Sequence, residues 1–313
     1  MLRSNVTPGI EKRAGMTWNL RKYWQYYVFL LPAVAYFIIF HYLPLYGVQI
    51  AFRNFSASKG FWGSPWVGLA HFQRFFSSYY FGTLIRNTVT ISLYGLILGF
   101  PLPIILALAL NEAKNGKFKK IAQTITYAPY FISVVVMCGM LIAFLSPTTG
   151  IINRMIGLLG IEPVAFLSSG KMFSSIYVIS GVWQGTGWGS IIYLASLAGV
   201  SQELHEAAIV DGANRFKRII HINLPHIIPT MTIMLILSAG GIMSVGHEKI
   251  LLLQNALNGE YSEVISTYVY KIGLVNAQYS FSTAVGLFNS VVNLILMVIV
   301  NLFAAKVGET SLW

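Results

Sequence analysis

Few residues in this 313-residue sequence have the types and spacing that catalysis or nucleotide binding would need. The two Gly-Lys pairs, at 116–117 and 170–171, are not followed by Ser or Thr, so the loop that cradles nucleotide phosphates is absent. The glycine-rich segment 185–189 has the wrong spacing for a dinucleotide loop, and the six histidines lack the spacing of metal ligands. A single cysteine, Cys138, excludes a cysteine-based zinc site. The pattern predicts a chain that is not an enzyme and that binds no metal or nucleotide itself.

Acidic, basic and small residues gather instead in one polar segment, residues 200–226, between two apolar runs. Ser201 can cap the start of a helix there, and Gly212 suits the turn that ends one. Glu206 lies inside this short helix with two alanines directly after it. Because alanines keep a helix slim and acids can pair with basic groups, such a helix is suited to a groove on another protein. Pro225 is expected to break the chain before the next apolar run.

The elements that must hold this segment are apolar. Hydrophobic residues make up 56% of the chain and charged residues only 10%, whereas about a quarter of a soluble domain is charged. A helix that crosses a bilayer needs about 20 apolar residues. Six stretches qualify: about 26–50, 87–110, 121–145, 173–199, 227–246 and 283–305. The expected fold class is all-α, a polytopic membrane protein with six transmembrane helices.

The distribution of Lys and Arg predicts the orientation. These residues are denser at the two termini and in the loops 111–120 and 200–226 than in the other loops, and the denser side is cytoplasmic. We therefore expect a cytoplasmic segment 1–25, a membrane domain 26–305 and a cytoplasmic tail 306–313. The same asymmetry accounts for the formal charge of +11 without nucleic acid as a partner.

The predicted span 173–199 carries small and polar residues. Three glycines recur on one face at four-residue intervals, which favours close packing of another helix: Gly181, Gly185 and Gly189. Gln184 and Trp188 share a neighbouring face, and Trp183 lies nearly opposite the glycines. These side chains suit the path of a polar, ring-shaped solute. Gln184 can equally bond to a neighbouring helix, and the sequence leaves both interpretations open.

The predicted span 283–305 gathers its polar residues on about one third of its circumference, at 100° per residue. They include Asn289, Ser290 and Asn293. Lipid disfavours such a face, so it must look at protein or at water. An uncharged polar face fits a hydroxyl-rich solute, and it also fits hydrogen bonding between helices at a subunit interface. Four of the predicted spans, 87–110, 121–145, 173–199 and the last as far as 303, contain no Asp or Glu, which argues against a proton-coupled carrier.

Aromatic residues crowd the predicted outer loop 53–85, which includes Trp62, Trp66 and Tyr79. Such residues favour the membrane–water boundary. They indicate either an interfacial anchor or a ledge on which an external partner docks.

The polar segment resembles the cytoplasmic EAA loop of permeases from binding-protein-dependent ABC importers. The resemblance rests on residues at the spacing of that loop: Glu206, Ala207, Ala208, Asp211, Gly212, Ala213, Ile222, Leu224 and Pro225. VGLAHFQRFF at 67–76 and RNT at 86–88 are similar to the carbohydrate-uptake branch. STYVYKIGL at 266–274, the run at 279–301 and SLW at 311–313 are similar to its complex-polysaccharide and oligosaccharide permeases, in which Asp often replaces Ser266.

This resemblance implies a type I importer permease whose EAA loop is the coupling helix seated in a cytoplasmic ATPase. It implies a homologous second permease, two ATPase subunits that bind ATP and Mg²⁺, and an extracytoplasmic solute-binding protein. The membrane would be the cytoplasmic membrane of a bacterial-type cell, and the substrate an oligosaccharide. The alternatives are a permease of this architecture for another polar solute such as a peptide or phosphate ester, an intramembrane transferase, and a scaffold or sensor. A transferase would need a catalytic acid or metal cluster near the bilayer, which the sequence does not offer.

Overall fold

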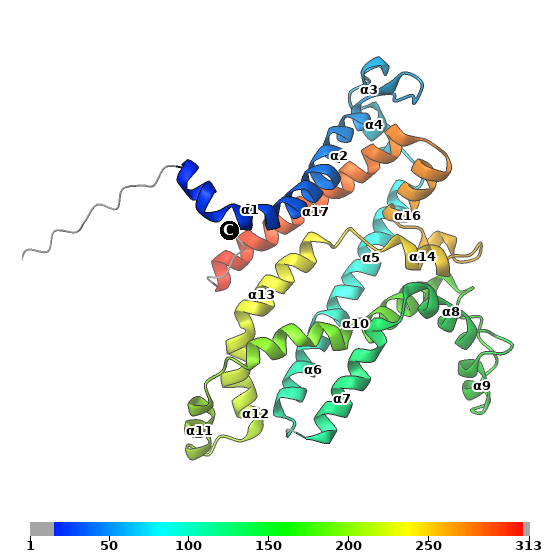
Figure 1. Ribbon diagram of the computed structural model, residues 1–313. Coiled ribbons are helices and arrows are strands. Elements are labelled where there is room, and N and C mark those ends of the chain that lie inside the picture. The colour runs from blue at the N-terminus through cyan, green and yellow to red at the C-terminus, as the bar shows by residue number, and fades with distance from the viewer. Residues whose placement is uncertain (1–15, 115, 309–313) are drawn as a thin grey trace, which may run out of the picture. The chain divides into compact units, whose positions relative to one another are not determined.

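The computed structural model describes residues 16–114 and 116–308, which form a succession of helices (Figure 1). The α-helices are α1 (Met16–Phe37), α2 (Leu43–Leu45), α3 (Gly60–Gly63), α4 (Ala70–Phe76), α5 (Phe81–Gly99), α6 (Pro101–Glu112), α7 (Lys117–Tyr127), α8 (Val134–Phe144), α9 (Ile151–Gly157), α10 (Gly170–Leu197), α11 (Gln202–Val210), α12 (Arg215–Arg218), α13 (Leu224–Gly240), α14 (His247–Leu253), α15 (Gly259–Ser262), α16 (Ile265–Tyr270) and α17 (Tyr279–Gly308). Five 3₁₀ or π-helical turns connect them: Ile38–Tyr42, Tyr46–Phe52, Ala128–Phe131, Ile219–Asn223 and Lys271–Val275. Over these described ranges the extended structure is one isolated bridge between Arg53 and Trp66, so the predicted all-α class is confirmed.

The chain divides into two compact units, one up to Gln49 and the other from Ile50 onward. The first unit contains α1 and α2, and its apolar side chains are exposed; Phe29, for example, is 84% exposed. Apolar surface on this scale needs lipid or protein around it. Residues 1–15 of the predicted cytoplasmic segment lie outside the described residues, and its remainder, 16–25, is the start of α1.

Within residues 16–114 and 116–308, four continuous helices are long and apolar enough to cross a membrane: Lys22–Phe52, Phe81–Glu112, Arg215–Gly240 and Tyr279–Lys306. The fourth corresponds to the predicted span 283–305, and the second joins α5 to α6 through Pro101 and covers the predicted span 87–110. The glycines and polar residues of α10 keep this 28-residue helix out of that group, although it is long enough, at about 1.5 Å per residue, to span the bilayer. The six-span count and the placement of the termini therefore stay predictions.

The predicted span 121–145 is not one continuous helix. It consists of two helical pieces, Lys117–Phe131 and Val134–Phe144, bent by 98° at a short break. Pro129 lies in the 3₁₀ turn that ends the first piece, and Ser133 begins the second by accepting a hydrogen bond from the Val136 N–H. A proline and a good capping residue four positions apart stop one helix and start another, so an apolar run of this length need not be one helix.

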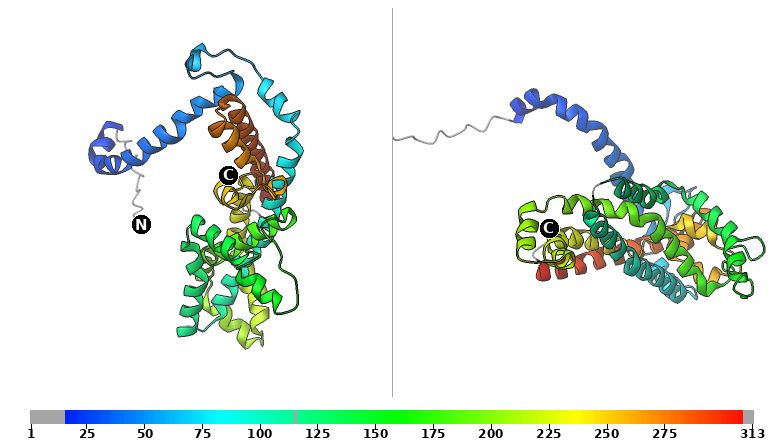
Figure 2. Two further views of the ribbon diagram at one scale, coloured as in Figure 1. Left: turned by 90° about the vertical axis from the view of Figure 1, so that its right-hand side faces the viewer. Right: turned by 90° about the horizontal axis from the view of Figure 1, so that it is seen from below.

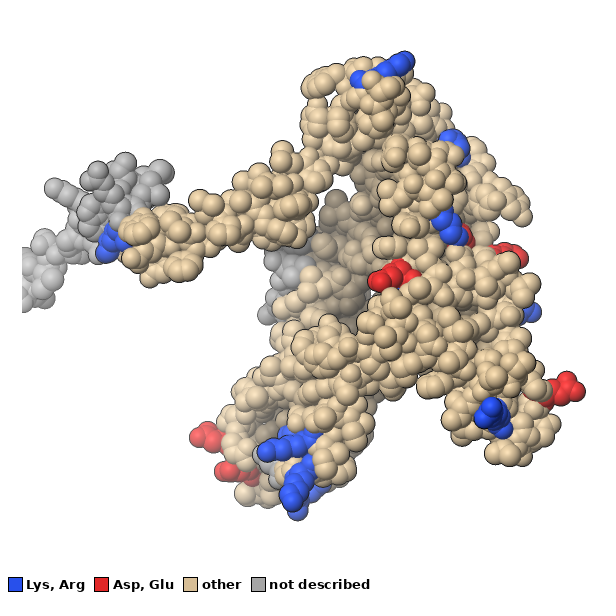
Figure 3. Space-filling model, turned by 45° about the vertical axis from the view of Figure 1, so that its right-hand side comes forward, with Lys and Arg blue, Asp and Glu red and all other residues tan. Residues whose placement is uncertain are grey.

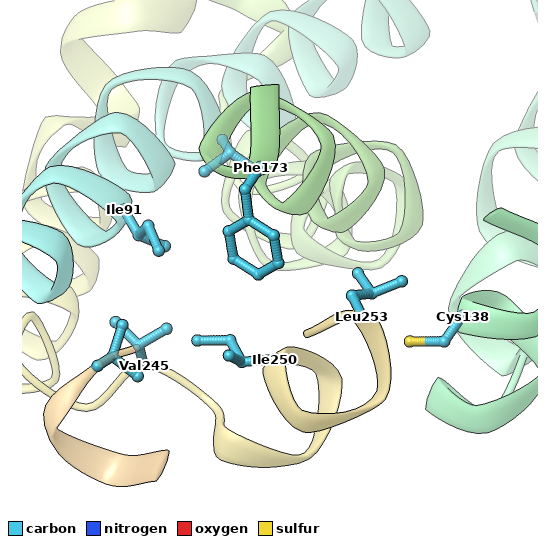
Figure 4. Packing of buried hydrophobic residues seen from close by; sticks show 8 residues of the cluster. Ile91, Cys138, Phe173, Val245, Ile250 and Leu253 are labelled. Carbon is cyan, nitrogen blue, oxygen red and sulfur yellow. The ribbon is translucent and has the colours of Figure 1, made fainter. Parts of the chain in front are cut away.

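The core forms where helices from distant parts of the sequence meet around α10. One cluster of buried side chains joins α5, α8, α10 and the segment around α14, and Figure 4 shows these side chains pointing toward one another: Ile91, Cys138, Phe173, Val245, Ile250 and Leu253. A second cluster joins α4 and α5 to α16 and α17, with Phe75 and Val285 fully buried. Helices α13 and α17 lie side by side, as Figure 2 also shows.

The aromatic residues of 53–85 do not share one role. Phe75 is fully buried in the second cluster, whereas Trp62 and Tyr79 are 82% and 92% exposed. Trp66 stacks on Phe52 and lies under the guanidinium of Arg53. Part of the segment therefore builds the core, and the exposed part keeps both earlier interpretations, an interfacial anchor or a docking ledge, open.

Candidate functional site

The polar segment contains a short helix, α11, whose two ends are stabilised by its own residues. Ser201 accepts a hydrogen bond from the Glu203 N–H at 3.2 Å, as predicted. At the other end Gly212 takes a φ of +77°, the left-handed conformation that glycine adopts without strain. The Ala213 N–H then donates to the Ala208 carbonyl at 2.8 Å, which completes the turn predicted at this glycine. The sequence therefore fixes the length of α11 locally.

Most of α11 is exposed: none of its residues is buried, and only His205 and Ala208 are half-buried. Glu206, Ala207 and Asp211 are exposed, and Ala208 and Ala213 are half-buried. Apolar side chains are exposed beside the acids; Val210 is 87% exposed and Leu204 57%. Charged atoms gather over the end of the molecule that carries α11 and α12, next to a largely uncharged surface on the helices above it (Figure 3). A charged, apolar and capped helix at this end is suited to contact a partner.

The chain does not break at Pro225, contrary to the prediction. Asn214 caps α12 by accepting from the Lys217 N–H at 2.9 Å, and the helix then continues through a π-helical turn, Ile219–Asn223, into α13. The Leu224 N–H bonds to the Ile219 carbonyl, five residues back. The wider turn just before Pro225 gives the ring room, since a proline inside a regular α-helix clashes with the preceding turn.

Three residues attach the base of this loop to the end of α6. The carboxylate of Glu112 accepts a hydrogen bond from Asn223 Nδ2 at 3.2 Å and lies 4.0 Å from the Arg218 guanidinium. Asn223 is fully buried. Within the described residues, the buried Asn223 Oδ1 and Arg218 Nε have no hydrogen-bond partner. Because unpaired buried polar groups are costly, the Glu112 carboxylate is the group that makes this junction tolerable.

Replacing Glu112 with alanine is expected to loosen this junction and to lower the thermal midpoint of the protein in detergent. The variant would leave Asn223 and Arg218 buried without their carboxylate, a loss of about 1–3 kcal/mol. Glu112→Gln, which keeps an acceptor for Asn223, is expected to lie between alanine and the native residue. Thermal unfolding of the three proteins in the same detergent tests this; an unchanged midpoint in Glu112→Ala would contradict it.

A second contact joins the loop to α10. His226 Nε2 lies 3.1 Å from the Ser196 carbonyl, and the Thr230 hydroxyl donates to Ser196 Oγ at 3.2 Å. Ile222 and Leu224 are half-buried, and Leu224 packs on a cluster that contains Tyr193 and Leu197. The end of the polar segment that leads into α13 is thus in contact with both α6 and α10.

A cavity of about 490 Å³ lies among these same helices, and we refer to it as the α10 cavity. It is lined by α5, α6, α10, α13 and the segment 241–246, and it follows α10 from Tyr177 to Tyr193, about 24 Å of helix. None of its described lining residues is charged. Its hydroxyl groups come from side chains on several of these elements: Ser92, Tyr177, Thr186, Tyr193, Ser238 and Ser244.

The three predicted packing glycines all line the α10 cavity, but only one of them lies tightly against another helix. A Cβ on Gly189 would lie 3.2 Å from the Pro103 ring of α6, whereas a Cβ on Gly185 would meet nothing within 4 Å. Gly181 faces the ammonium of Lys249. The tightest approach is at Gly187, where a Cβ would overlap the Thr126 carbonyl of α7. Gly187 lies outside the four-residue repeat, so helical periodicity gave no signal for it.

Two of the three other predicted path residues of α10, Gln184 and Trp188, lie at the bend between α7 and α8. Gln184 Nε2 donates to the Ile132 carbonyl at 2.7 Å, and Trp188 stacks on Tyr130 with ring centres 4.5 Å apart. Trp183 lines a separate cavity of about 710 Å³ against α8. None of these three side chains lines the α10 cavity, and their role in a solute path stays a prediction.

The polar face of α17 supports the cavity wall. Asn293 accepts from the Met243 N–H at 2.8 Å and donates to Ser244 Oγ at 2.8 Å, and Ser244 lines the α10 cavity. Asn289 Oδ1 is buried and has no partner among the described residues. The exposed Ser290 bonds to the Gly286 carbonyl of its own helix. Direct contact of these three with a solute stays a prediction.

Residues 99–309 match the model of a protein family described as the binding-protein-dependent transport system inner membrane component. The chain belongs to this family. The match begins at the end of α5 and includes the polar segment, all of α17 and the lining of the α10 cavity apart from the part of α5 before residue 99. The permease is therefore a membrane-spanning transport subunit and not a catalytic chain, and the predicted membership is confirmed.

The permease is similar to known proteins over nearly its whole length. It is 42% identical to Protein LplB of Bacillus subtilis (strain 168) over 98% of this chain and 97% of the relative. It is 40% identical to the polygalacturonan/rhamnogalacturonan transport system permease protein YteP of the same organism, over 97% of this chain and 94% of the relative. A chain from the crystal structure of a bacterial alginate ABC transporter, in complex with an alginate pentasaccharide-bound periplasmic protein, matches with a TM-score of 0.87 and 39% identity, over 95% of this chain and 99% of that one.

Proposed function

We propose that the permease takes up oligosaccharides as one membrane subunit of an ATP-driven importer, with α11 as the helix that couples it to a separate ATPase. The observation that carries the proposal is α11 itself. It is capped at both ends, is exposed over most of its surface, and presents acids beside apolar side chains at the end of the molecule where charges gather. A helix of this kind in a membrane transport subunit needs a water-soluble partner to cover it.

The ATPase would receive α11 in a cleft. Glu206 and Asp211 would pair with basic groups of the ATPase, and Ala207, Ala208 and Gly212 would allow its backbone to approach closely. ATP and Mg²⁺ would be bound by the two ATPase subunits and not by this chain. A movement of α11 would reach α13 through the continuous helix from Arg215, and α6 and α10 through Glu112 and Ser196. Because these helices line the α10 cavity, its shape would follow the state of the ATPase.

The substrate proposal rests on the relatives and on the cavity. Two of the proteins named above, YteP and the alginate transporter, are named for the transport of polygalacturonan, rhamnogalacturonan and alginate, all of which are sugar chains. The α10 cavity offers hydroxyl groups and aromatic rings and no charged lining residue, and such a lining suits a hydroxyl-rich chain. A homologous second permease would complete the path, and an extracytoplasmic solute-binding protein would deliver the sugar. The assembly would lie in the cytoplasmic membrane of a bacterial cell.

Reconstitution tests this proposal. The permease is placed in vesicles with its partner permease, the ATPase subunits and the binding protein, and ATP turnover and sugar uptake are measured together. We expect the binding protein loaded with oligosaccharide to stimulate both. ATP turnover that ignores the loaded binding protein, with no sugar entering the vesicles, would refute the proposal, and stimulation by a peptide or phosphate ester instead of a sugar would favour the alternative substrate.

A further inference from the structure

A lysine that no mechanism above has used lies at the wall of the α10 cavity. Lys249 of α14 is partly buried, and its Nζ donates a hydrogen bond to the Tyr177 carbonyl of α10 at 2.8 Å. The ammonium also lies 4.6 Å from the centre of the Tyr177 ring. It can come this close because residue 181 is a glycine; a Cβ there would lie 3.3 Å from Nζ.

This ammonium has no acidic partner in the part of the chain that the structure describes. The two ion pairs found there are Arg218 with Glu112 and Lys271 with Glu263. An ammonium has three N–H donors, and the structure shows one of them in use. Burial lowers the pKa of Lys249 to about 8, so the group is still largely charged at neutral pH. Partial desolvation of a cation without a counterion costs free energy of folding. A function for the charge would explain why this cost is tolerated.

The position of Lys249 beside the α10 cavity indicates such a function. Both residues of α10 that it approaches, Tyr177 and Gly181, line the α10 cavity, and so does Gly246, three residues before it. None of the described lining residues carries a charge. The Lys249 ammonium is therefore a cation placed beside an otherwise uncharged cavity, at the end where α14 meets α10.

A purely structural role would be to hold α14 against α10. Ile250 and Leu253 of α14 already do this, since both are buried in the cluster with Phe173. A neutral donor would satisfy the Tyr177 carbonyl without the cost of desolvating a charge. The cation–π contact with the Tyr177 ring accounts for part of the charge, but it leaves two N–H donors of the ammonium without an acceptor among the described residues.

We propose that Lys249 is a specificity-determining residue that binds the carboxylate of an acidic oligosaccharide, a chain containing uronic acid units, as the chain enters the α10 cavity. This inference rests on the proposed sugar transport and adds the charge of the substrate to it. The free N–H donors of the ammonium meet one carboxylate, while the uncharged lining accepts the rest of the chain. A neutral sugar gains nothing from this contact.

The test compares two probes of the same chain length, a charged oligogalacturonate and its neutral methyl-esterified form, in vesicles that contain the complete transporter with its binding protein. We expect Lys249→Met to raise the apparent KM for the oligogalacturonate by about tenfold or more and to leave transport of the methyl ester nearly unchanged. Lys249→Arg, which keeps the charge, is expected to retain most of the preference for the acidic probe.

The outcomes are distinguishable. Equal loss of both probes in Lys249→Met, or no loss of either, would overturn the inference and leave sugar transport intact. The inference would also be overturned if the native transporter moved the methyl ester and other neutral oligosaccharides but no acidic one. Failure of the native transporter to move any sugar would refute the proposed function, and this inference with it. The melting temperature of each variant in detergent, and its ATP turnover with the neutral probe, separate misfolding from a change in selectivity.

Discussion

Replacing Glu206 with alanine is expected to abolish most of the ATP-driven uptake while the permease still inserts and folds. Glu206 is exposed on α11, forms no ion pair with the described residues, and is neither a cap nor a turn residue of its own helix. Alanine also has a higher helix propensity than glutamate, so α11 itself should persist. We therefore expect the loss of uptake to result from a weaker contact between α11 and the ATPase.

The expected size follows from what a charge does in an interface. Removing one member of a hydrogen-bonded charge pair that becomes buried on binding costs about 2–5 kcal/mol, which is on the order of 30-fold or more in affinity. Co-purification of the ATPase with the tagged permease, together with uptake in vesicles, measures the effect. The expected result is weak or absent ATPase in the purified complex.

Glu203 provides the matched control. It is the same residue type on the same helix and is also exposed, but it lies in the first turn, where its carboxylate favours the positive end of the helix dipole. Glu203→Ala is expected to change uptake little, because that contribution is about 0.3–1 kcal/mol. If Glu206→Ala retained native ATPase stoichiometry and normal uptake, the coupling role of α11 would be refuted.

The features of α11 that could be predicted from sequence are those set by neighbouring residues. Ser201 and Gly212 lie at the ends of the helix because a hydroxyl acceptor and a glycine in the left-handed conformation satisfy its terminal backbone groups. These interactions reach only a few residues along the chain. The contact between Glu112 and Asn223, by comparison, joins residues 111 positions apart, and no local sequence pattern predicts it.

The bend in the predicted span 121–145 was missed for a related reason. Apolar content predicts that a segment enters the bilayer but not that it is straight. Pro129 and Ser133 were both visible in the sequence, and together they end α7 and begin α8. The carbonyl freed at this break, at Ile132, is satisfied by Gln184 of another helix. That pairing depends on how α10 packs, and a single sequence does not show packing.

A second substitution with a large expected effect is Gly187→Ala, which should destabilise the permease. A Cβ at this position would overlap the carbonyl oxygen and carbon of Thr126, which belong to the backbone of α7. A flexible side chain could rotate away, but a helix backbone cannot, so α10 and the piece that contains α7 would have to separate. Overpacking of this kind costs about 1–3 kcal/mol and sometimes more. The substitution should also weaken the contacts that Gln184 and Trp188 make at the bend.

Gly185→Ala is the matched control for Gly187→Ala. Gly185 lies two residues earlier in the same helix, and a Cβ there would meet nothing within 4 Å. Both substitutions raise helix propensity by about 1 kcal/mol, so their difference reports the contact with Thr126 alone. We expect Gly187→Ala to lower the thermal midpoint in detergent and the yield of folded protein, and Gly185→Ala to leave both unchanged or slightly raised. The added methyl group of Gly185→Ala enters the α10 cavity, which Gly185 lines, so uptake should fall in that variant although its stability does not. Equal midpoints for the two variants would show that α10 does not depend on Gly187 for its packing against α7.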